Sequence, residues 1–231
     1  MNISLIVPLC FTTTEHEDDM PYLFQFTKDG TLLCVKSILG LDLSKFKNIY
    51  FTILSEYNQK YNLSTLLKLQ FRKLGIKNAH IIILRKPTNS QVETVYKTIK
   101  RANIKGALFI KDSDGYFRGD FTLTNGIAIY PLDKLEMVNP SHKSYIQIDD
   151  QFYITNIIER KIISRYFNAG GYIFESADIF CQYYNKLSML TPLYMSHVIY
   201  AMLLDKIPFR PFEVENFIDW GNEKIYNYFK Q

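Results

Sequence analysis

The stretch LFIKDSDGYF (residues 108–117) ends an apolar run with two carboxylates, Asp112 and Asp114, that stand one residue apart. Two negative charges that leave a strand so close together repel each other unless a cation lies near them. Carboxylate oxygens are hard ligands, and Mg²⁺ commonly binds through one or two of them together with the phosphates of a substrate. The motif is therefore a candidate site for Mg²⁺ or Mn²⁺ and a nucleotide.

A plainer interpretation of the same motif stays open. Asp114 is followed by Gly115, and Asp–Gly after a strand is ordinary turn chemistry. A solvated turn would explain the two charges without any ligand. The motif alone does not decide between the two.

Two other segments have the residue types of a binding site. PTNSQVETV (87–95) lies just past an apolar run, at the expected start of a helix. Free backbone N–H groups at a helix start favour contacts with phosphates or nucleobases. Asp219, in IDWGN, is another carboxylate that follows an apolar stretch. Each also has a structural explanation, because Thr88, Ser90 and Asp219 could be helix caps.

The elements that must position these residues alternate in the first half of the chain. Strands are predicted at 3–9, 48–54, 79–84 and 106–110, and helices at 32–41, 58–74 and 90–102. Near-continuous β-branched runs separated by helices are typical of parallel strands covered on both faces. The pattern predicts an α/β fold with a mostly parallel sheet and helices on both faces. Ligands of such sheets bind beyond the carboxyl ends of the strands, which is where Asp112 and Asp114 would lie.

After residue 120 the pattern changes. IAIY, SYIQID, QFYITNII and GGYIF are strands too close together for intervening helices, so we expect an antiparallel appendage. Helices are predicted over 176–187 and 193–205, and a last one in NEKIYNYFK near the end of the chain. No repeat or linker interrupts the sequence, so a single domain over 1–231 is expected.

Composition excludes several classes. The net charge of +4 is spread without a basic stripe, so no nucleic-acid partner is expected. The three cysteines form no C-x-x-C pair, which favours free thiols in a reducing, cytoplasmic environment. No apolar run approaches the roughly 20 residues of a membrane span, and the first residues lack the basic region of a signal peptide.

By these motifs and their order, the chain resembles the sugar-phosphate nucleotidyltransferases, a pyrophosphorylase-type family with a Rossmann-like GT-A fold. It is most similar to the branch found with bacterial capsule and surface-polysaccharide genes. The resemblance runs through most of the chain. The segments that carry it are MPYLFQFTKDGTLL (20–33), NIYFTIL (48–54), KPTNSQVETVYKTIK (86–100), FIKDSDGYF (109–117), SYIQIDDQFYITNIIERKIIS (144–164), GGYIFESADIF (170–180) and FIDWGNEKIYNYF (217–229).

The resemblance implies a role for each candidate residue. Asp114 matches the aspartate that holds the catalytic Mg²⁺ (or Mn²⁺), Asp219 matches the late aspartate that completes the metal site, and Asp112 would assist them. The implied nucleotide-binding residues are Leu9, Pro87, Thr88, Ser90 and Gln91. The implied binding residues for the phosphorylated sugar or polyol are Glu159 with Arg160 or Lys161, and Gly171. A homodimer is left open.

The family's strongest motif is missing. After the first strand the family carries G-x-G-x-R-F and, some ten residues on, Pro–Lys, which wrap and neutralise the triphosphate. Here that stretch reads PLCFTTTEHEDDMPYLF, and Pro21–Tyr22 stands at the Pro–Lys position. The stretch holds four acids, namely Glu15, Glu17, Asp18 and Asp19. A triphosphate would meet these charges without a fixed cation, unless extra Mg²⁺ bridges them or the loop folds away so that Thr12–Thr14 and Lys36 serve instead.

Three functions remain open from the sequence. The first is a nucleotidyltransferase that joins an NTP and a phosphorylated sugar or alcohol with release of pyrophosphate, in capsule or surface-polysaccharide precursor synthesis. The second is a GT-A glycosyltransferase that uses D-S-D to bind a metal and a nucleotide diphosphate sugar. The third is a homologue without turnover that binds a nucleotide or a sugar phosphate, or supports a partner enzyme.

Overall fold

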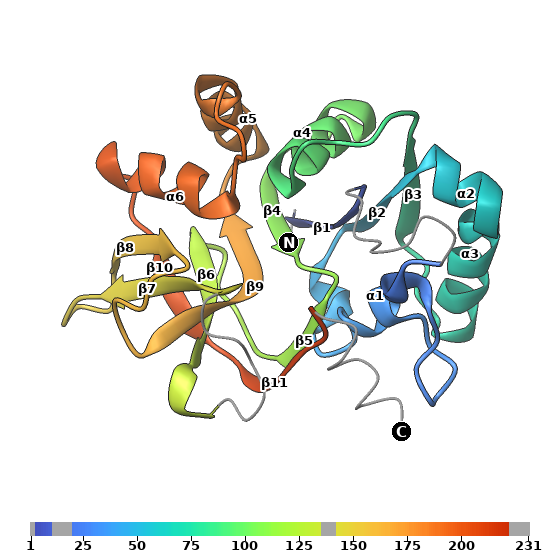
Figure 1. The fold of residues 1–231 in the computed structure, drawn as a ribbon, viewed down its shortest axis with the longest axis horizontal. Coiled ribbons are helices and arrows are strands. Elements are labelled where there is room, and N and C mark those ends of the chain that lie inside the picture. Colours follow the sequence, from blue (N-terminus) through green and yellow to red (C-terminus); the bar gives the residue numbers. More distant parts are fainter. Residues whose placement is uncertain (1–2, 11–19, 135–141, 222–231) are drawn as a thin grey trace.

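The computed structural model describes residues 3–10, 20–134 and 142–221. In this part of the chain a mixed sheet of nine strands forms the centre, in the order β10–β6–β9–β4–β1–β2–β3, with β7 and β8 attached through β9 (Figure 1). The strands of this sheet are β1 (Ile3–Leu9), β2 (Asn48–Leu54), β3 (Ala79–Leu84), β4 (Ala107–Lys111), β6 (Gly126–Pro131), β7 (Ser144–Ile148), β8 (Ile154–Glu159), β9 (Tyr166–Phe174) and β10 (Arg210–Glu213).

The parallel half of the sheet follows the predicted alternation of strands and helices. β4, β1, β2 and β3 run parallel, and their register brings Val7 of β1 beside Phe51 of β2 and Phe51 beside Ile81 of β3. All seven residues of β1 are buried, as expected for a strand covered on both faces. The predicted bounds of β1, β2 and β3 are confirmed residue for residue.

The antiparallel appendage is also confirmed. β9 runs antiparallel between β4 and β6, and β7 and β8 form an antiparallel pair that joins β9 at Tyr145. β10 returns parallel to β6 at the far edge. The predicted class is therefore confirmed, with a mixed α/β sheet whose parallel half continues into antiparallel strands.

The helices lie on both faces of the sheet (Figure 1). They are α1 (Leu33–Lys36), α2 (Ser55–Tyr61), α3 (Leu63–Lys73), α4 (Gln91–Ala102), α5 (Ala177–Leu187) and α6 (Met195–Leu204). Two predictions were wrong in extent. The helix expected over 32–41 is a single turn, α1, and the helix expected over 58–74 is broken at Asn62, whose φ of 52° is left-handed and cannot continue a right-handed helix.

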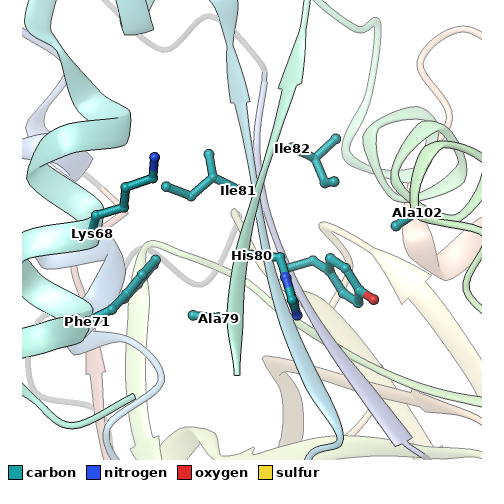
Figure 2. Close-up of a pocket in the computed structure, with 8 residues that line it drawn as sticks. Lys68, Phe71, Ala79, His80, Ile81, Ile82 and Ala102 are labelled. Carbon is teal, nitrogen blue, oxygen red and sulfur yellow. The ribbon is translucent and has the colours of Figure 1, made fainter. Parts of the chain in front are cut away.

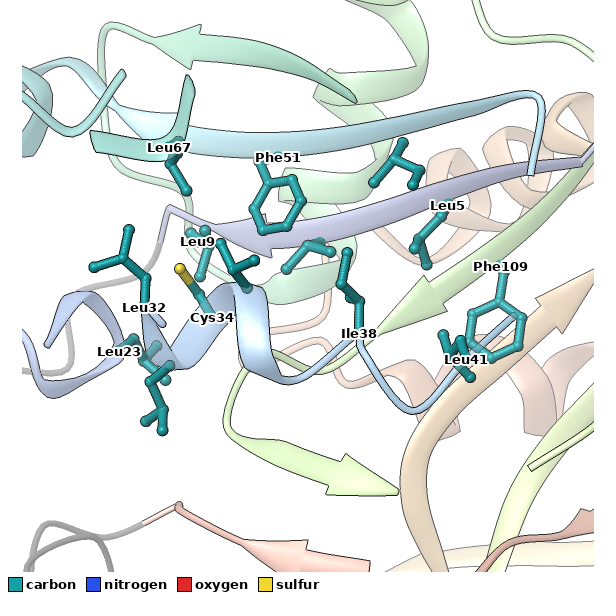
Figure 3. Close-up of a cluster of buried hydrophobic side chains, with 14 of the residues drawn as sticks. Leu5, Leu9, Leu23, Leu32, Cys34, Ile38, Leu41, Phe51, Leu67 and Phe109 are labelled. Carbon is teal, nitrogen blue, oxygen red and sulfur yellow. The ribbon is translucent and has the colours of Figure 1, made fainter. Parts of the chain in front are cut away.

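Two hydrophobic clusters fill the space between the sheet and its helices. One buries side chains of β1 and β2 against α1 and α3, and Figure 3 shows Leu5 and Phe51 pointing from the sheet toward the segment that carries Ile38. The other packs α4, α5 and α6 on the opposite face. Burial on both faces fixes the sheet, so the ends of its strands are a rigid place for a site.

A small second sheet was not predicted. It consists of β5 (Gly115–Arg118) and β11 (Glu215–Asp219), which run antiparallel. The strand β5 follows β4 after a short turn, and Gly40 lies so close to it that a Cβ there would be 1.8 Å from the carbonyl oxygen of Phe117. The predicted last helix and the acidic stretch 15–19 lie outside the described residues.

No helix among 3–10, 20–134 and 142–221 is long and apolar enough to cross a membrane. The three cysteines are free and buried, in agreement with the expectation of free thiols.

Candidate active site

The D-S-D motif lies at the carboxyl end of β4, as predicted. The backbone N–H of Asp112 donates to Gly170 O at 2.8 Å, which extends the pairing of β4 with β9 by one residue. The backbone of Asp114 accepts a hydrogen bond from Trp220 N at 2.7 Å, next to the pairing of Gly115 with Asp219. Three strands therefore fix the backbone that carries the motif.

This pairing brings Asp114 and Asp219 together. A Cβ built on Gly221 would lie 2.8 Å from Asp219 Oδ1 and 3.4 Å from Asp114 Oδ2, so both carboxylates face the same small space. Gly221 N also donates to Asp219 Oδ1 at 2.8 Å. A larger side chain at Gly221 would enter this space, which is the physical reason for a glycine here.

Asp112 is held by neighbouring side chains. Gln91 Nε2 donates to its Oδ1, and Tyr172 Oη donates to its Oδ2 at 3.3 Å. Tyr172 is fixed in turn by Asn168, whose Nδ2 donates to Tyr172 Oη at 2.6 Å. Burial raises the pKa of Asp112 to about 6, and the charge of Asp114 adds to this rise. With both oxygens accepting hydrogen bonds, Asp112 links Gln91 at the start of α4 to Tyr172 of β9.

Two lysines that the sequence did not single out compensate the acidic charge. Lys111 is fully buried, and its Nζ donates to Asp112 O at 2.9 Å and to Gly115 O at 2.8 Å. Burial lowers its pKa to about 8. Lys143 Nζ lies 2.6 Å from Asp219 Oδ2. Lys111 therefore stabilises the turn through backbone carbonyls, whereas Lys143 pairs with a carboxylate.

Tyr22, at the position where the resembled family has lysine, also lies within electrostatic reach of the carboxylates. Burial raises its pKa, and the charges of Asp114 and Asp219 raise it further. The residue belongs to a 3-10 turn over Tyr22–Phe24. A phenol, not a cation, therefore stands at this position.

Two pockets meet at the D-S-D turn. One, of about 140 Å³, is lined by Asp114 and Asp219, which we call the carboxylate pair. Polar residues at β9 and at the start of β7 also line it, among them Lys143, Ser144 and Asn168. The other, of about 390 Å³, is lined by Asn89, Ser90, Gln91, Asp112, Ser113, Asp114 and the segment 192–195. Asp112 and Asp114 line both pockets, so two ligands could bind on either side of these carboxylates.

The implied nucleotide-binding residues fall into three groups. Ser90 and Gln91 line the larger pocket, and Ser90 Oγ also caps α4 by accepting from Glu93 N at 3.1 Å. Thr88 is buried, and its hydroxyl lies 2.6 Å from that of Thr94. Two further residues line neither pocket: Pro87, which is exposed, and Leu9, which is buried in the core. Of these five residues, only Ser90 and Gln91 line a pocket in which they could contact a ligand directly.

The implied acceptor residues lie around the smaller pocket but do not line it. Glu159 accepts hydrogen bonds from Ser144 Oγ at 2.7 Å and from Ser196 Oγ. Arg160 and Lys161 are exposed. A Cβ at Gly171 would meet Phe117 at 2.8 Å, so this residue faces the core, and its neighbour Gly170 lines the pocket instead.

A separate cavity of about 510 Å³ lies at the sheet edge formed by β3 (Figure 2). Its lining residues are Tyr50, Lys68, Phe71, Ala79, His80, Ile81, Ile82 and Ala102. None of the candidate residues is among them. The chemistry suggested by the sequence belongs to the two pockets at the carboxyl end of β4.

The carboxylate pair fits a hard divalent cation. The described part of the chain contains no group of three or more His, Cys, Asp or Glu residues that could hold a metal ion by themselves. Asp114 and Asp219 nevertheless present oxygen ligands to one space, and Mg²⁺ is commonly held by one or two carboxylates, substrate phosphates and water. These two residues would hold the ion.

Solved structures that share this fold include a pyrophosphorylase and a CTP transferase. A nucleoside-diphosphate-sugar pyrophosphorylase from Vibrio cholerae superposes with a TM-score of 0.81, at 13% identity over 97% of this chain and 98% of that one. An inositol-1-phosphate CTP transferase from T. maritima superposes with a TM-score of 0.73, at 14% identity over 99% and 95%. HddC from Yersinia pseudotuberculosis, solved with GMP-PN, gives 0.64 at 16% identity over 99% and 97%. The chain shares the fold of these proteins over nearly its whole length.

No protein-family model matches the sequence, and no curated protein matches it either. The likeness is therefore one of structure.

Proposed function

We propose that this protein is a divalent-metal-dependent nucleotidyltransferase that transfers a nucleoside monophosphate from an NTP to a phosphorylated sugar or alcohol and releases pyrophosphate. The observation that carries the proposal is that Asp114 lines one pocket with Gln91 and an adjoining pocket with Asp219. These residues come from three distant segments of the chain, and they line two adjoining pockets. The shared fold supports the same reaction class.

In this proposal the chain's own groups bind and orient the two substrates. Mg²⁺ or Mn²⁺, when bound, neutralises negative charge on the α-phosphate and helps to align the attacking oxygen. Asp114 and Asp219 would hold the metal ion at a fixed place. The Ser90–Gln91 segment faces the nucleotide in the larger pocket, and the phosphorylated acceptor binds in the smaller one. Lys143 offers the acceptor a cation.

Asp112 positions the groups around it in this proposal. Its hydrogen bonds to Gln91 and Tyr172 couple the start of α4 to β9. These hydrogen bonds hold the two pockets at a fixed distance from each other. Such pre-organisation contributes to the rate because the reacting groups need no rearrangement.

The test is a screen for pyrophosphate release with CTP, UTP, GTP, ATP and dTTP against phosphorylated sugars and polyols, in Mg²⁺ or Mn²⁺. Asp114→Asn should lower turnover at least a thousandfold, because it removes a carboxylate that would hold the metal ion, and that ion would stabilise the negative charge of the transition state. The matched control is Asp178→Asn, an exposed aspartate that pairs with Lys105 at 3.0 Å outside the site and should leave turnover unchanged. Full turnover in Asp114→Asn would contradict the assignment.

A second candidate is a glycosyltransferase that uses a nucleotide diphosphate sugar. It is favoured by one sequence observation, the four acids at 15–19 in place of the glycines and basic residues that wrap a triphosphate. Transfer or hydrolysis of a nucleotide diphosphate sugar without pyrophosphate formation would select it. A role in capsule or surface-polysaccharide precursor synthesis is proposed for the first candidate from the sequence motifs alone.

A further inference from the structure

Lys143 makes the closest cationic contact with the carboxylate pair. Its Nζ lies 2.6 Å from Asp219 Oδ2, and the two side chains are only 17% and 10% exposed. The same ammonium lies 5.4 Å from the ring centroid of Phe217 and 5.9 Å from that of Phe167. Two ring faces and one carboxylate therefore hold the charge in a partly desolvated place.

The charge of Lys143 reaches beyond Asp219. Burial raises the pKa of Asp114, and the nearby charge of Lys143 opposes this rise. Lys111 is nearby, but its Nζ donates to backbone carbonyls and is directed to the turn. Among the described residues, Lys143 is thus the cation that pairs directly with this site.

The position of Lys143 is unfavourable for a divalent cation at Asp114 and Asp219. A divalent ion shared by Asp114 and Asp219 would lie in the space that both carboxylates face, close to the ammonium on Asp219 Oδ2. Two cations on one carboxylate repel each other strongly in a partly buried site. Lys143 also lines the smaller pocket, so an anion bound there would lie near this side chain.

We propose that Lys143 is a positioning residue that neutralises Asp219 in the ligand-free protein and moves to a phosphate oxygen of the substrate when a divalent cation occupies the carboxylate pair. This inference rests on the metal site of the proposed function. It makes the metal and the phosphorylated ligand bind cooperatively, because each one removes an obstacle to the other. The metal alone binds weakly while Lys143 stays on Asp219.

The experiment measures Mn²⁺ binding directly, by the loss of the free-ion electron paramagnetic resonance signal, with and without inorganic phosphate. Lys143→Met keeps the aliphatic contacts with Phe167 and Phe217 and removes the charge. We expect this variant to bind Mn²⁺ at least tenfold more tightly than the unmodified protein when phosphate is absent. Phosphate should strengthen Mn²⁺ binding in the unmodified protein and have at least a fivefold smaller effect in the variant.

Two further variants complete the design. Lys186→Met is the matched control, because Lys186 also pairs with an aspartate, Asp205 at 3.3 Å, and lies over an aromatic ring, Tyr183, away from the site. Its Mn²⁺ affinity should be unchanged. Lys143→Arg keeps the charge and should bind Mn²⁺ as weakly as the unmodified protein. Thermal unfolding confirms that each variant is folded.

The outcomes separate this inference from the proposed function. Equal or weaker Mn²⁺ binding in Lys143→Met than in the unmodified protein, including no binding in either, would overturn the role of Lys143. Tighter binding in Lys143→Met with no pyrophosphate release by the unmodified protein for any substrate would support the role of Lys143 and reject the transferase.

Discussion

Gly170 shows how closely the backbone of β9 approaches the carboxylate turn. Its φ is +79°, and a Cβ there would lie 2.7 Å from Asp112 Oδ2 and 2.8 Å from Asp112 Cβ. A side chain would therefore combine backbone strain with displacement of a carboxylate that links both pockets. The residue is a glycine for two independent physical reasons.

Gly170→Ala should lower the free energy of unfolding by about 3 kcal/mol, from strain and overpacking together. The control is Gly75→Ala, where φ is +69° but no atom lies within 4 Å of the added Cβ. That change should cost only about 1 kcal/mol, which is the left-handed strain alone. Urea unfolding of both variants measures the difference, and equal losses would show that the contact with Asp112 is unimportant.

Lys111 gives a prediction about pH. Its folded-state pKa of about 8 lies below the ordinary 10.5, so between these values the unfolded chain holds more protons than the folded protein. The free energy of unfolding contributed by Lys111 must then rise as the pH increases from 8 to 10.5, by up to about 3 kcal/mol. Below pH 8 the full cost of the buried charge is present.

The comparison with Lys111→Met isolates this contribution from other groups that titrate at high pH. Urea unfolding at pH 7.5 and pH 10 should show that the stability difference, unmodified protein minus variant, increases with pH. A difference that stays constant would mean that Lys111 keeps its proton in the folded state.

At the residue scale the sequence predicts a site more readily than it predicts the partners within that site. Asp114 and Gln91 follow buried strands, and a rule about the carboxyl ends of strands brings them together. Lys143 lies in PSHKSY, where no spacing or hydrophobic pattern distinguishes it from a surface lysine. Its partner, Asp219, is fixed only when β11 pairs with β5, and tertiary pairing of this kind leaves no local signal.

At the scale of elements, the buried parallel strands were the most predictable part. Short, continuous apolar runs are possible only where both faces are covered, so β1, β2 and β3 match their predicted bounds. The pair β5–β11 was missed because strands of four and five residues with polar interruptions resemble loops. The break at Asn62 in the helix expected over 58–74 was missed because its leucines, at 63, 66, 67, 69 and 74, all follow Asn62 and give no signal for where the preceding helix ends.

The break at Asn62 leads to a test. Asn62 has a φ of 52°, and its side chain accepts a hydrogen bond from Thr65 Oγ1 at 2.8 Å. Both Asn62→Gly and Asn62→Ala lose that bond, but only alanine is strained in this conformation. We expect alanine to be about 1 kcal/mol less stable than glycine by thermal or urea unfolding. The reverse order would mean that α2 and α3 can join into one helix.

At the scale of the whole molecule, the site draws on both hydrophobic layers. The D-S-D turn follows β4, which contributes Phe109 to one cluster and Ile110 to the other. Binding at this turn should therefore stabilise the folded chain as a whole. Any ligand that binds only the folded state raises its stability by mass action.

One of the five NTPs, together with Mg²⁺, should raise the midpoint of thermal unfolding by about 5–10 °C at a hundredfold excess over its Kd. The shift should disappear with EDTA and in Asp219→Asn, and it should persist in Asp178→Asn. A shift that survives the loss of Asp219 would place the ligand elsewhere.

The pairing of β5 with β11 also has a consequence for synthesis on the ribosome. Asp114 emerges with the first half of the chain, but its partner Asp219 follows only after β6 to β10 have been made. A nascent chain can therefore complete its parallel layer while it is still unable to bind a metal ion at this pair. The candidate site would therefore be completed late, after most of the scaffold has formed.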